Sequence, residues 1–89
     1  PVKRNDGSWL VDGMSPINEI EELLGLKNMQ GDGDFHTLAG FMLAQMGHIP
    51  KTGDRFSWQN VGFEVVDMDG RRIDKVLIVP PAPDTVPEI

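Results

Sequence analysis

Residues 34 to 54 form one complete helical unit in the sequence, and this unit constrains the architecture more than any other segment. On a helix of 3.6 residues per turn, the bulky residues of the unit fall on one side. They are Phe35, Leu38, Phe41, Met42 and Met46. The opposite side carries only small residues, which are Thr37, Gly40, Ala44 and Gly47. Gly47 stops the helix and Pro50 begins the exit, so the pattern predicts a helix that packs on two sides.

The small side of this helix is the first candidate for an interaction surface. A glycine inside a helix is about 1 kcal/mol less favourable than alanine, so Gly40 needs a packing reason. Close approach of another backbone or subunit supplies one, and we predict it at Thr37, Gly40 and Ala44. Trp58 lies beside an irregularity in a predicted strand, and we predict that it projects onto a partner surface. The other aromatic residues are predicted to lie in the core.

Composition narrows the class of protein. The 89 residues include 39% apolar and 25% charged residues, which is ordinary for one soluble globular domain. The formal net charge of -6 repels phosphate, so we expect no nucleic-acid partner. No apolar run is long enough to cross a bilayer, and no signal pattern is present. The absence of cysteine excludes disulfides and thiolate zinc sites, and the initial proline leads us to expect a piece of a longer protein.

The first half of the chain predicts one strand and two helices. Residues 9–11 form a short apolar run before an Asp-Gly turn, and we expect an edge strand there. Ser15 and Pro16 are predicted as the N-cap and first residue of a helix that Gly25 stops. The polar residues 28–33 between the two helices are expected to form a mobile loop.

The second half predicts antiparallel strands. Apolar and polar residues alternate from Phe56 to Val65 with one slip at residues 59–62, which indicates a bulge or a tight turn. The sequence of residues 67–70 is a strong hairpin signal, and a strand over residues 71–79 returns from it. We therefore predict an α+β fold in which two helices pack on a small, mainly antiparallel sheet, in the order β-α-α-β-β-β.

The same patterns predict the boundaries of the domain. Residues 1–7 are expected to be a disordered leader and residues 8–79 the folded domain. Residues 80–89 contain four prolines, Pro80, Pro81, Pro83 and Pro87, and are expected to form an extended Pro-rich tail.

Candidate chemical sites are few. Residues 31–34 superficially suggest a phosphate loop, but they bring two carboxylates and no lysine, so a flexible loop with Asp34 as helix cap is favoured. Residues 67–70 start like a calcium loop but lack its later ligands. His36 and His48 lie at opposite ends of the second helix, where they cannot share a metal, and His48 is expected to interact with the last helix carbonyls. No catalytic triad is visible, and we predict no enzymatic activity.

Three segments together resemble the transporter-associated domain of the CorC and HlyC family. They are Trp9–Gly13 with Pro16–Ile17 and Glu22–Leu26; Thr37–Phe41 with Met46–Pro50 and Gly53–Asp54; and Phe63–Ile73 with Lys75–Val76. The resemblance covers residues 8–79. It implies a fold similar to a subdomain of the PCMH-type flavin-binding fold, and a cytoplasmic position in a larger membrane protein, beside CBS modules and a membrane-spanning domain. Such proteins include putative magnesium and cobalt efflux proteins and hemolysin-like proteins.

Three functions follow as hypotheses. The first is a non-catalytic regulatory or docking domain of a membrane ion transporter, which contacts neighbouring modules or a second copy of itself. The alternative is a small-molecule module that binds flavin adenine dinucleotide (FAD) or an adenine nucleotide between the helices and the sheet, and it rests on the fold analogy alone. A third is direct sensing of divalent cations by the surplus carboxylates. The residues themselves indicate no cofactor.

Overall fold

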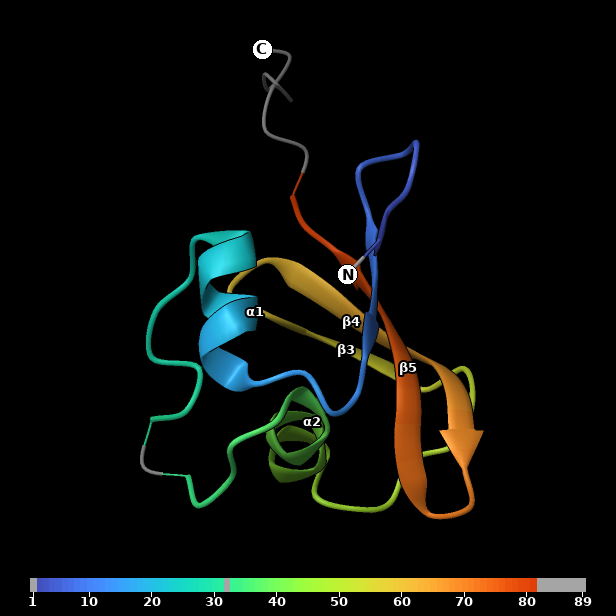
Figure 1. Ribbon diagram of the computed structural model, residues 1–89. Coiled ribbons are helices and arrows are strands. Elements are labelled where there is room, and N and C mark those ends of the chain that lie inside the picture. Colours follow the sequence, from blue (N-terminus) through green and yellow to red (C-terminus); the bar gives the residue numbers. More distant parts are fainter. Residues whose placement is uncertain (1, 32, 82–89) are drawn as a thin grey trace, which may run out of the picture.

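A computed structural model describes residues 2–31 and 33–81, which form a five-stranded antiparallel sheet with two helices on one face (Figure 1). The elements are β1 (Val2–Lys3), β2 (Trp9–Asp12), α1 (Ile17–Leu24), α2 (Leu38–Met46), β3 (Arg55–Trp58), β4 (Val61–Asp69) and β5 (Arg72–Val79). The strand order across the sheet is β1-β2-β5-β4-β3. The predicted α+β class and the predicted order β-α-α-β-β-β are confirmed, with β1 as an additional strand.

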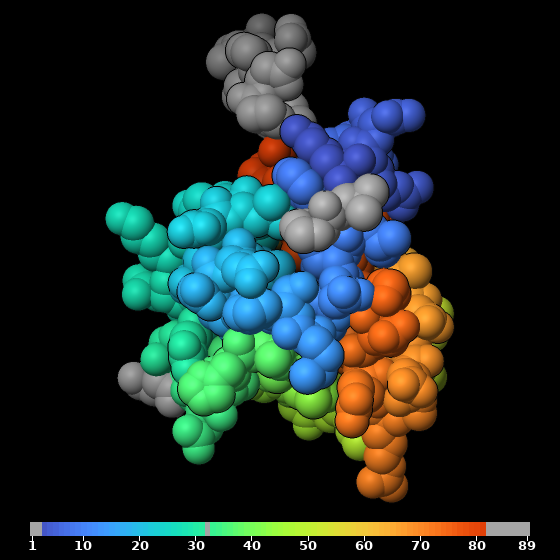
Figure 2. All heavy atoms as spheres, viewed as in Figure 1, coloured from blue at the N-terminus to red at the C-terminus, as the bar shows by residue number. Residues whose placement is uncertain are grey.

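The core lies between the sheet and the two helices. Alternate residues of β4 and β5 point toward the helices, as the two-residue period of a strand requires. The buried sheet residues are Val11, Val61, Phe63, Val65, Ile73, Val76 and Ile78, and the helices contribute Ile17, Ile20, Leu38, Ala39, Phe41 and Met42. The opposite face of the sheet carries no helix (Figure 1). Figure 2 shows the helix side, where the blue segment that leads into α1 lies between α1 and the orange hairpin of β4 and β5.

Residues 2–7 form the first strand and the turn of a β-hairpin, where we expected a disordered leader. β1 pairs with β2, and Val2 lies opposite Leu10 while Lys3 lies opposite Trp9. The Lys3 ammonium is 5.7 Å from the centroid of the Trp9 ring, within the range of a cation–π contact. The prediction of β2 as an edge strand is wrong, because β2 lies between β1 and β5.

Asp6 and Ser8 hold the turn of this hairpin. The Asp6 carboxylate accepts hydrogen bonds from the Ser8 hydroxyl at 2.6 Å and from the Ser8 backbone N–H at 3.0 Å. These bonds favour the ionised carboxylate and hold the pKa of Asp6 below its usual 3.8. Hydrophobic periodicity did not indicate this hairpin, because its turn is held by hydrogen bonds of a polar side chain.

The helix α1 ends where we predicted but begins at Ile17, one residue after the predicted first residue, Pro16. Gly25 has φ 69°, and the Leu26 N–H donates to the Glu21 carbonyl at 3.0 Å, which is the six-to-one bond of a Schellman motif. The N-cap is Pro16, without a side-chain cap, so the prediction of Ser15 as N-cap is wrong. The Ser15 carbonyl instead accepts from the Leu38 N–H at 2.9 Å and ties the start of α1 to the start of α2.

Gly13 connects both helices to the sheet. Its N–H donates to the Asp74 carbonyl at 2.8 Å, and its carbonyl accepts from the Ala39 N–H at 2.8 Å. A Cβ atom at this position would overlap the carbonyl oxygen of Ile73. Glycine is therefore required here by the close approach of two backbones, and the position fixes where α2 begins relative to β5.

Tight turns join the last three strands. The slip in the alternation is a two-residue turn in which Gln59 and Asn60 have φ of 50° and 68°, so the tight-turn alternative is confirmed. The predicted hairpin between β4 and β5 is also present. It turns at Gly70, with φ 65°, and Arg71, so β5 begins at Arg72.

The pairing of β4 with β5 contains irregularities that the sequence did not indicate. The register shifts by one residue at Val66 and shifts back at Asp74, because Asp67 pairs with Lys75, whereas the flanking pairs Val65–Val76 and Met68–Ile73 share one register. Pro80 and Pro81 follow β5 without regular structure, and the remainder of the predicted tail, residues 82–89, lies outside the described residues.

Candidate interaction surface

The start of α2 is organised by Thr37. Its hydroxyl accepts a hydrogen bond from the Gly40 N–H at 3.2 Å, and its extended backbone makes it the N-cap. The prediction of Asp34 as the helix cap is therefore wrong, and the helix begins at Leu38. Thr37 also pairs with Pro16 in an isolated antiparallel bridge, so it has a structural role within the domain.

Gly40 has a packing partner within the domain. A Cβ atom at Gly40 would lie 2.6 Å from the Cβ of Phe35, which is closer than real contacts of this kind. Phe35 precedes the helix and folds over it at this glycine. The close approach that the sequence indicated is thus made by the chain itself at Gly40, and contact with a partner there stays a prediction.

The remainder of α2 offers an uncharged exposed surface. Ala44 and Gln45 are exposed, and no residue from Leu38 to Met46 carries a charge. Gly47 ends the helix with φ 77°, as predicted. The centres of protein interfaces are depleted in charged residues, so Ala44 is the member of the predicted set that this helix leaves available for a partner.

Trp58 belongs to an aromatic cluster that we define as Phe35, Phe41, Phe56, Trp58 and Phe63. The Trp58 ring meets the buried Phe41 ring edge-on, with centroids 5.4 Å apart and an interplanar angle of 84°. Phe35 also meets Phe41 edge-on at 5.9 Å. Phe35, Phe56 and Trp58 are only half-buried, so the cluster reaches from the core to the surface. Part of the Trp58 ring packs inside the domain, and contact between its remaining surface and a partner stays a prediction.

The loop between the helices contains a core residue that sequence analysis missed. Met29 is 2% exposed, and its N–H donates to the Glu21 carboxylate at 2.9 Å. The Gln30 side-chain amide donates to the Phe35 carbonyl at 2.7 Å. These contacts tie the described part of residues 28–33 to α1 and to the entry of α2, where we expected a mobile loop. A methionine at the centre of a polar stretch was the available signal.

An ionic pair joins β2 to β5 on the face without helices. The Lys75 ammonium donates to Asp12 at 2.7 Å and lies 3.6 Å from Asp74. The hydrogen bond from Lys75 holds the pKa of Asp12 below its usual 3.8, and the same bond raises the pKa of Lys75 above 10.5. Both side chains are accessible to solvent, so the pair serves mainly to fix register.

His48 has the helix-end role that the sequence predicted. Its Nδ1 lies 3.0 Å from the Met46 carbonyl oxygen, at the C-terminal end of α2. Its Nε2 lies 3.8 Å from the Asp54 carboxylate, which also accepts from the Lys51 N–H at 3.1 Å. The site is exposed, and its groups organise the turn after α2.

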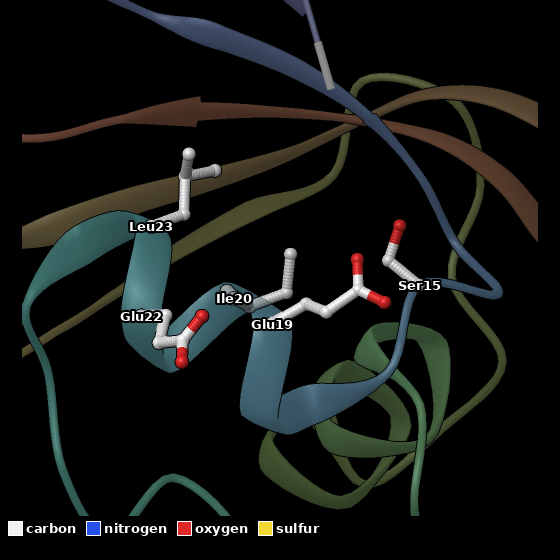
Figure 3. A pocket seen from close by; sticks show the side chains of 5 residues that line it. All are labelled: Ser15, Glu19, Ile20, Glu22 and Leu23. Atoms are coloured by element: carbon white, nitrogen blue, oxygen red, sulfur yellow. The ribbon is translucent and has the colours of Figure 1, made fainter.

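The hollows on the described surface are open and shallow. One of about 270 Å³ lies beside α1 and is lined by Ser15, Glu19, Ile20, Glu22 and Leu23 (Figure 3). In Figure 3 the side chains of Ser15 and Glu19 point to the same region, while Glu22 projects elsewhere. A second of about 490 Å³ separates α2 from the tip of the β4–β5 hairpin. Within residues 2–31 and 33–81, no three histidine or acidic side chains are grouped as metal ligands.

A family model described as the transporter-associated domain, CorC_HlyC, matches residues 2–82. The chain belongs to this family. The match includes residues 2–7, in agreement with the structural role of β1. The fold described above is thus that of a CorC_HlyC domain.

Full-length relatives are much longer than this chain. A UPF0053 protein of Synechocystis is 46% identical over 79 residues, which cover 86% of this chain and 18% of that protein. The polyamine export protein of Salmonella typhimurium is 39% identical over 77 residues, which cover 86% of this chain and 17% of that protein. The chain thus spans less than a fifth of these relatives. Neither helix of the described residues has the length and hydropathy of a membrane span.

Solved structures of the same domain have the same fold. The CorC_HlyC domain of a Xylella fastidiosa hemolysin, in complex with Mg++ and Mn++, is 44% identical with a TM-score of 0.80, over 91% of this chain and 96% of that chain. The CorC_HlyC domain from Nitrosomonas europaea is 30% identical with a TM-score of 0.82, over 89% and 93%.

Proposed function

We propose that this CorC_HlyC domain is a non-catalytic docking and regulatory domain of a larger membrane transporter, placed on the cytoplasmic face of the membrane. Its partners are then the CBS modules and the membrane domain of the same protein, and a second copy of the chain. Membership of a transporter-associated family and similarity to export proteins support this proposal. The cargo is a cation, with magnesium or cobalt implied by the resemblance and polyamines by the name of one relative.

The uncharged surface of α2 is the observation that carries the docking proposal. The domain has a net charge of -6, yet its second helix has no charged residue and exposes Ala44. An exposed surface without charge on a strongly charged domain is suited to burial against another module. The half-buried Trp58 contributes an aromatic anchor of the kind that is enriched in interfaces.

The test is a charge placed at the centre of this surface in the full-length transporter. Ala44→Arg should disrupt docking and alter cation transport, because a buried unpaired charge is strongly unfavourable. Asn18→Arg makes the same change in charge at an exposed position of α1 and serves as the matched control. Gly40→Leu is a poor test, because it would displace Phe35. Unchanged transport and unchanged domain contacts in Ala44→Arg would refute the proposal.

We also propose weak binding of divalent cations as a second function, because the Xylella relative was solved in complex with Mg++ and Mn++. The surplus of 14 acidic over 8 basic residues favours cation binding electrostatically. Calorimetry with magnesium, manganese and cobalt tests this binding. Heats no larger than those of dilution would refute it. Competition by 150 mM monovalent salt separates a coordinated site from a diffuse ion atmosphere.

FAD binding stays a prediction from the fold analogy, and no contact or hollow described above favours it. A flavin site buries most of the ligand in a concave pocket, whereas the described hollows are open. Absorbance of the purified protein near the flavin bands and a thermal shift with FAD decide the question.

A further inference from the structure

The strand β3 forms a free edge of the sheet. It is the last strand in the order and pairs only with β4. The Val65 N–H donates to the Asp54 carbonyl at 2.8 Å, which identifies this opposing pair as hydrogen-bonded. Since such pairs alternate along antiparallel strands, Phe56 and Trp58 bond toward β4, and the backbone groups of Arg55 and Ser57 point outward.

These outward-facing groups are accessible. Arg55 and Ser57 are both exposed, and no backbone or side-chain hydrogen bond to the outward groups of either residue is found within the described chain. β3 contains no proline and no bulge, two of the features that usually protect an edge strand from pairing. The edge is therefore able to accept another strand.

A shallow groove lies beside this edge, on the face of the sheet without helices. It has a volume of about 450 Å³ and is lined by Arg55, Phe56, Ser57, Gly62, Phe63, Glu64 and Val79. Ser57 lies opposite Gly62, and Gly62 lies opposite Val79, so the floor of the groove runs from the small residues Ser57 and Gly62 at the free edge to the exposed Val79. Glu64 lies at its side, half-buried and without a salt bridge to any described residue.

We propose that β3 pairs antiparallel with β3 of a second copy of this chain, with Phe56 opposite Phe56 of the partner subunit. In this register the outward groups of Arg55 bond to those of the partner's Ser57, and the reverse pair forms by two-fold symmetry. The sheet continues through the interface, and both helix layers lie on the same side. A shift of two residues in one direction would set Arg55 opposite the partner's Arg55, which is electrostatically unfavourable.

Charge and shape favour a second copy as the occupant. In the proposed register the side chain of the partner's Arg55 stands beside Ser57 and extends over Gly62 toward the side chain of Val79, which ends the groove. Glu64 faces Arg55 of its own chain across β3 and β4, where the structure shows no ion pair between them, and it lies diagonally opposite the partner's Arg55, to whose guanidinium it supplies a carboxylate. On the helix side, the half-buried ring of Phe56 meets its symmetry mate and becomes covered. Each copy thus supplies both the arginine and the groove that receives it.

The experiment measures self-association of the 89-residue chain by sedimentation equilibrium up to roughly 1 mM, because a four-residue edge gives weak pairing. Ser57→Pro removes the outward N–H without removing a bond to β4, and should weaken association by at least about tenfold. Ser57→Ala keeps the N–H and should associate as the wild type does. Arg55→Glu should weaken association similarly, and the charge swap Arg55→Glu/Glu64→Arg should restore it.

An isotope-filtered nuclear Overhauser experiment on a mixed-label sample tests the register. The predicted result is an intersubunit contact between the Phe56 Hα atoms, which face each other in a non-hydrogen-bonded pair. A chain that is monomeric at the highest concentration, or a dimer that is insensitive to both Ser57→Pro and Arg55→Glu, overturns the proposal. If Ser57→Pro fails to fold, the intersubunit Phe56 contact decides, because Arg55 also faces Glu64 within one chain. Docking through Ala44 concerns another surface, so it can stand when this proposal fails.

Discussion

Replacing Gly13 with alanine tests whether the junction between β2, β5 and α2 determines the stability of the domain. The added methyl group would overlap the Ile73 carbonyl oxygen and lie 3.0 Å from its carbon. Both neighbours belong to backbone in the middle of a sheet, so the chain around Gly13 must move. That movement weakens the hydrogen bonds of Gly13 with Asp74 and Ala39.

The expected loss of stability can be worked out from these contacts. Overpacking of a well-packed site is destabilising by about 1 to 3 kcal/mol, and each weakened hydrogen bond contributes up to about 1 kcal/mol. Replacement of glycine by alanine also restricts the unfolded chain, which offsets roughly 0.4 to 1 kcal/mol. The free energy of unfolding should therefore fall by roughly 3 kcal/mol, and the Tm by roughly 12 to 24 °C for a domain of this size.

Urea denaturation, followed by the fluorescence of Trp9 and Trp58, measures this change. Gly62→Ala is the matched control, because its Cβ would meet Val79 at an ordinary 3.6 Å; it should be neutral or slightly stabilising. A Gly13→Ala variant within about 0.5 kcal/mol of the wild type would refute the steric reasoning, since that is the range of ordinary surface substitutions.

Three further predictions concern packing, capping and charge. Met29→Ala should lower the free energy of unfolding by about 2 to 5 kcal/mol, whereas the exposed Met14→Ala should change it by less than about 0.5 kcal/mol in the same urea titration. Thr37→Ala should lower it by about 1 kcal/mol and Thr37→Ser should not, because serine also caps α2; equal effects would contradict the capping role. The stabilisation from Asp12 and Lys75 is present between their unfolded pKa values of 3.8 and 10.5. It is lost as pH falls through the lowered pKa of Asp12 or rises through the raised pKa of Lys75. Tm profiles of the wild type and Lys75→Met should therefore converge at both extremes, and a constant difference would contradict this role.

The local backbone conformation could be predicted from the sequence wherever a single residue determines it. Gly25, Gly47 and Gly70 all have positive φ where a helix stop or a hairpin was predicted. The class of the fold could be predicted from hydrophobic periodicity, because the period of a helix or of a strand can be recognised within each segment by itself. The turn at residues 59–62 was predicted only as one of two alternatives. A bulge and a tight turn both interrupt the alternation of apolar and polar residues in the same way.

The features that the sequence did not indicate depend on contacts between distant segments. Burial of Met29 requires α1 to supply Glu21 as the acceptor for its N–H. The tight fit at Gly40 is made by Phe35, so the small side of the helix was visible in the sequence while its internal partner was not. The irregularities near Val66 and Asp74 arise from pairing across the sheet. Local patterns carry no information on such contacts.

The most direct test of the docking account is the accessibility of α2 in the complete transporter. The 89 residues contain no cysteine, so, once any cysteine in the remainder of the transporter is replaced, a cysteine at Ala44 or, as control, at Asn18 reports its own exposure through its alkylation rate. If α2 docks against another module, Ala44→Cys should react at least about tenfold more slowly in the transporter than in the isolated domain, with Asn18→Cys unchanged. Equal rates at Ala44→Cys in both settings would contradict the claim that this surface meets another module.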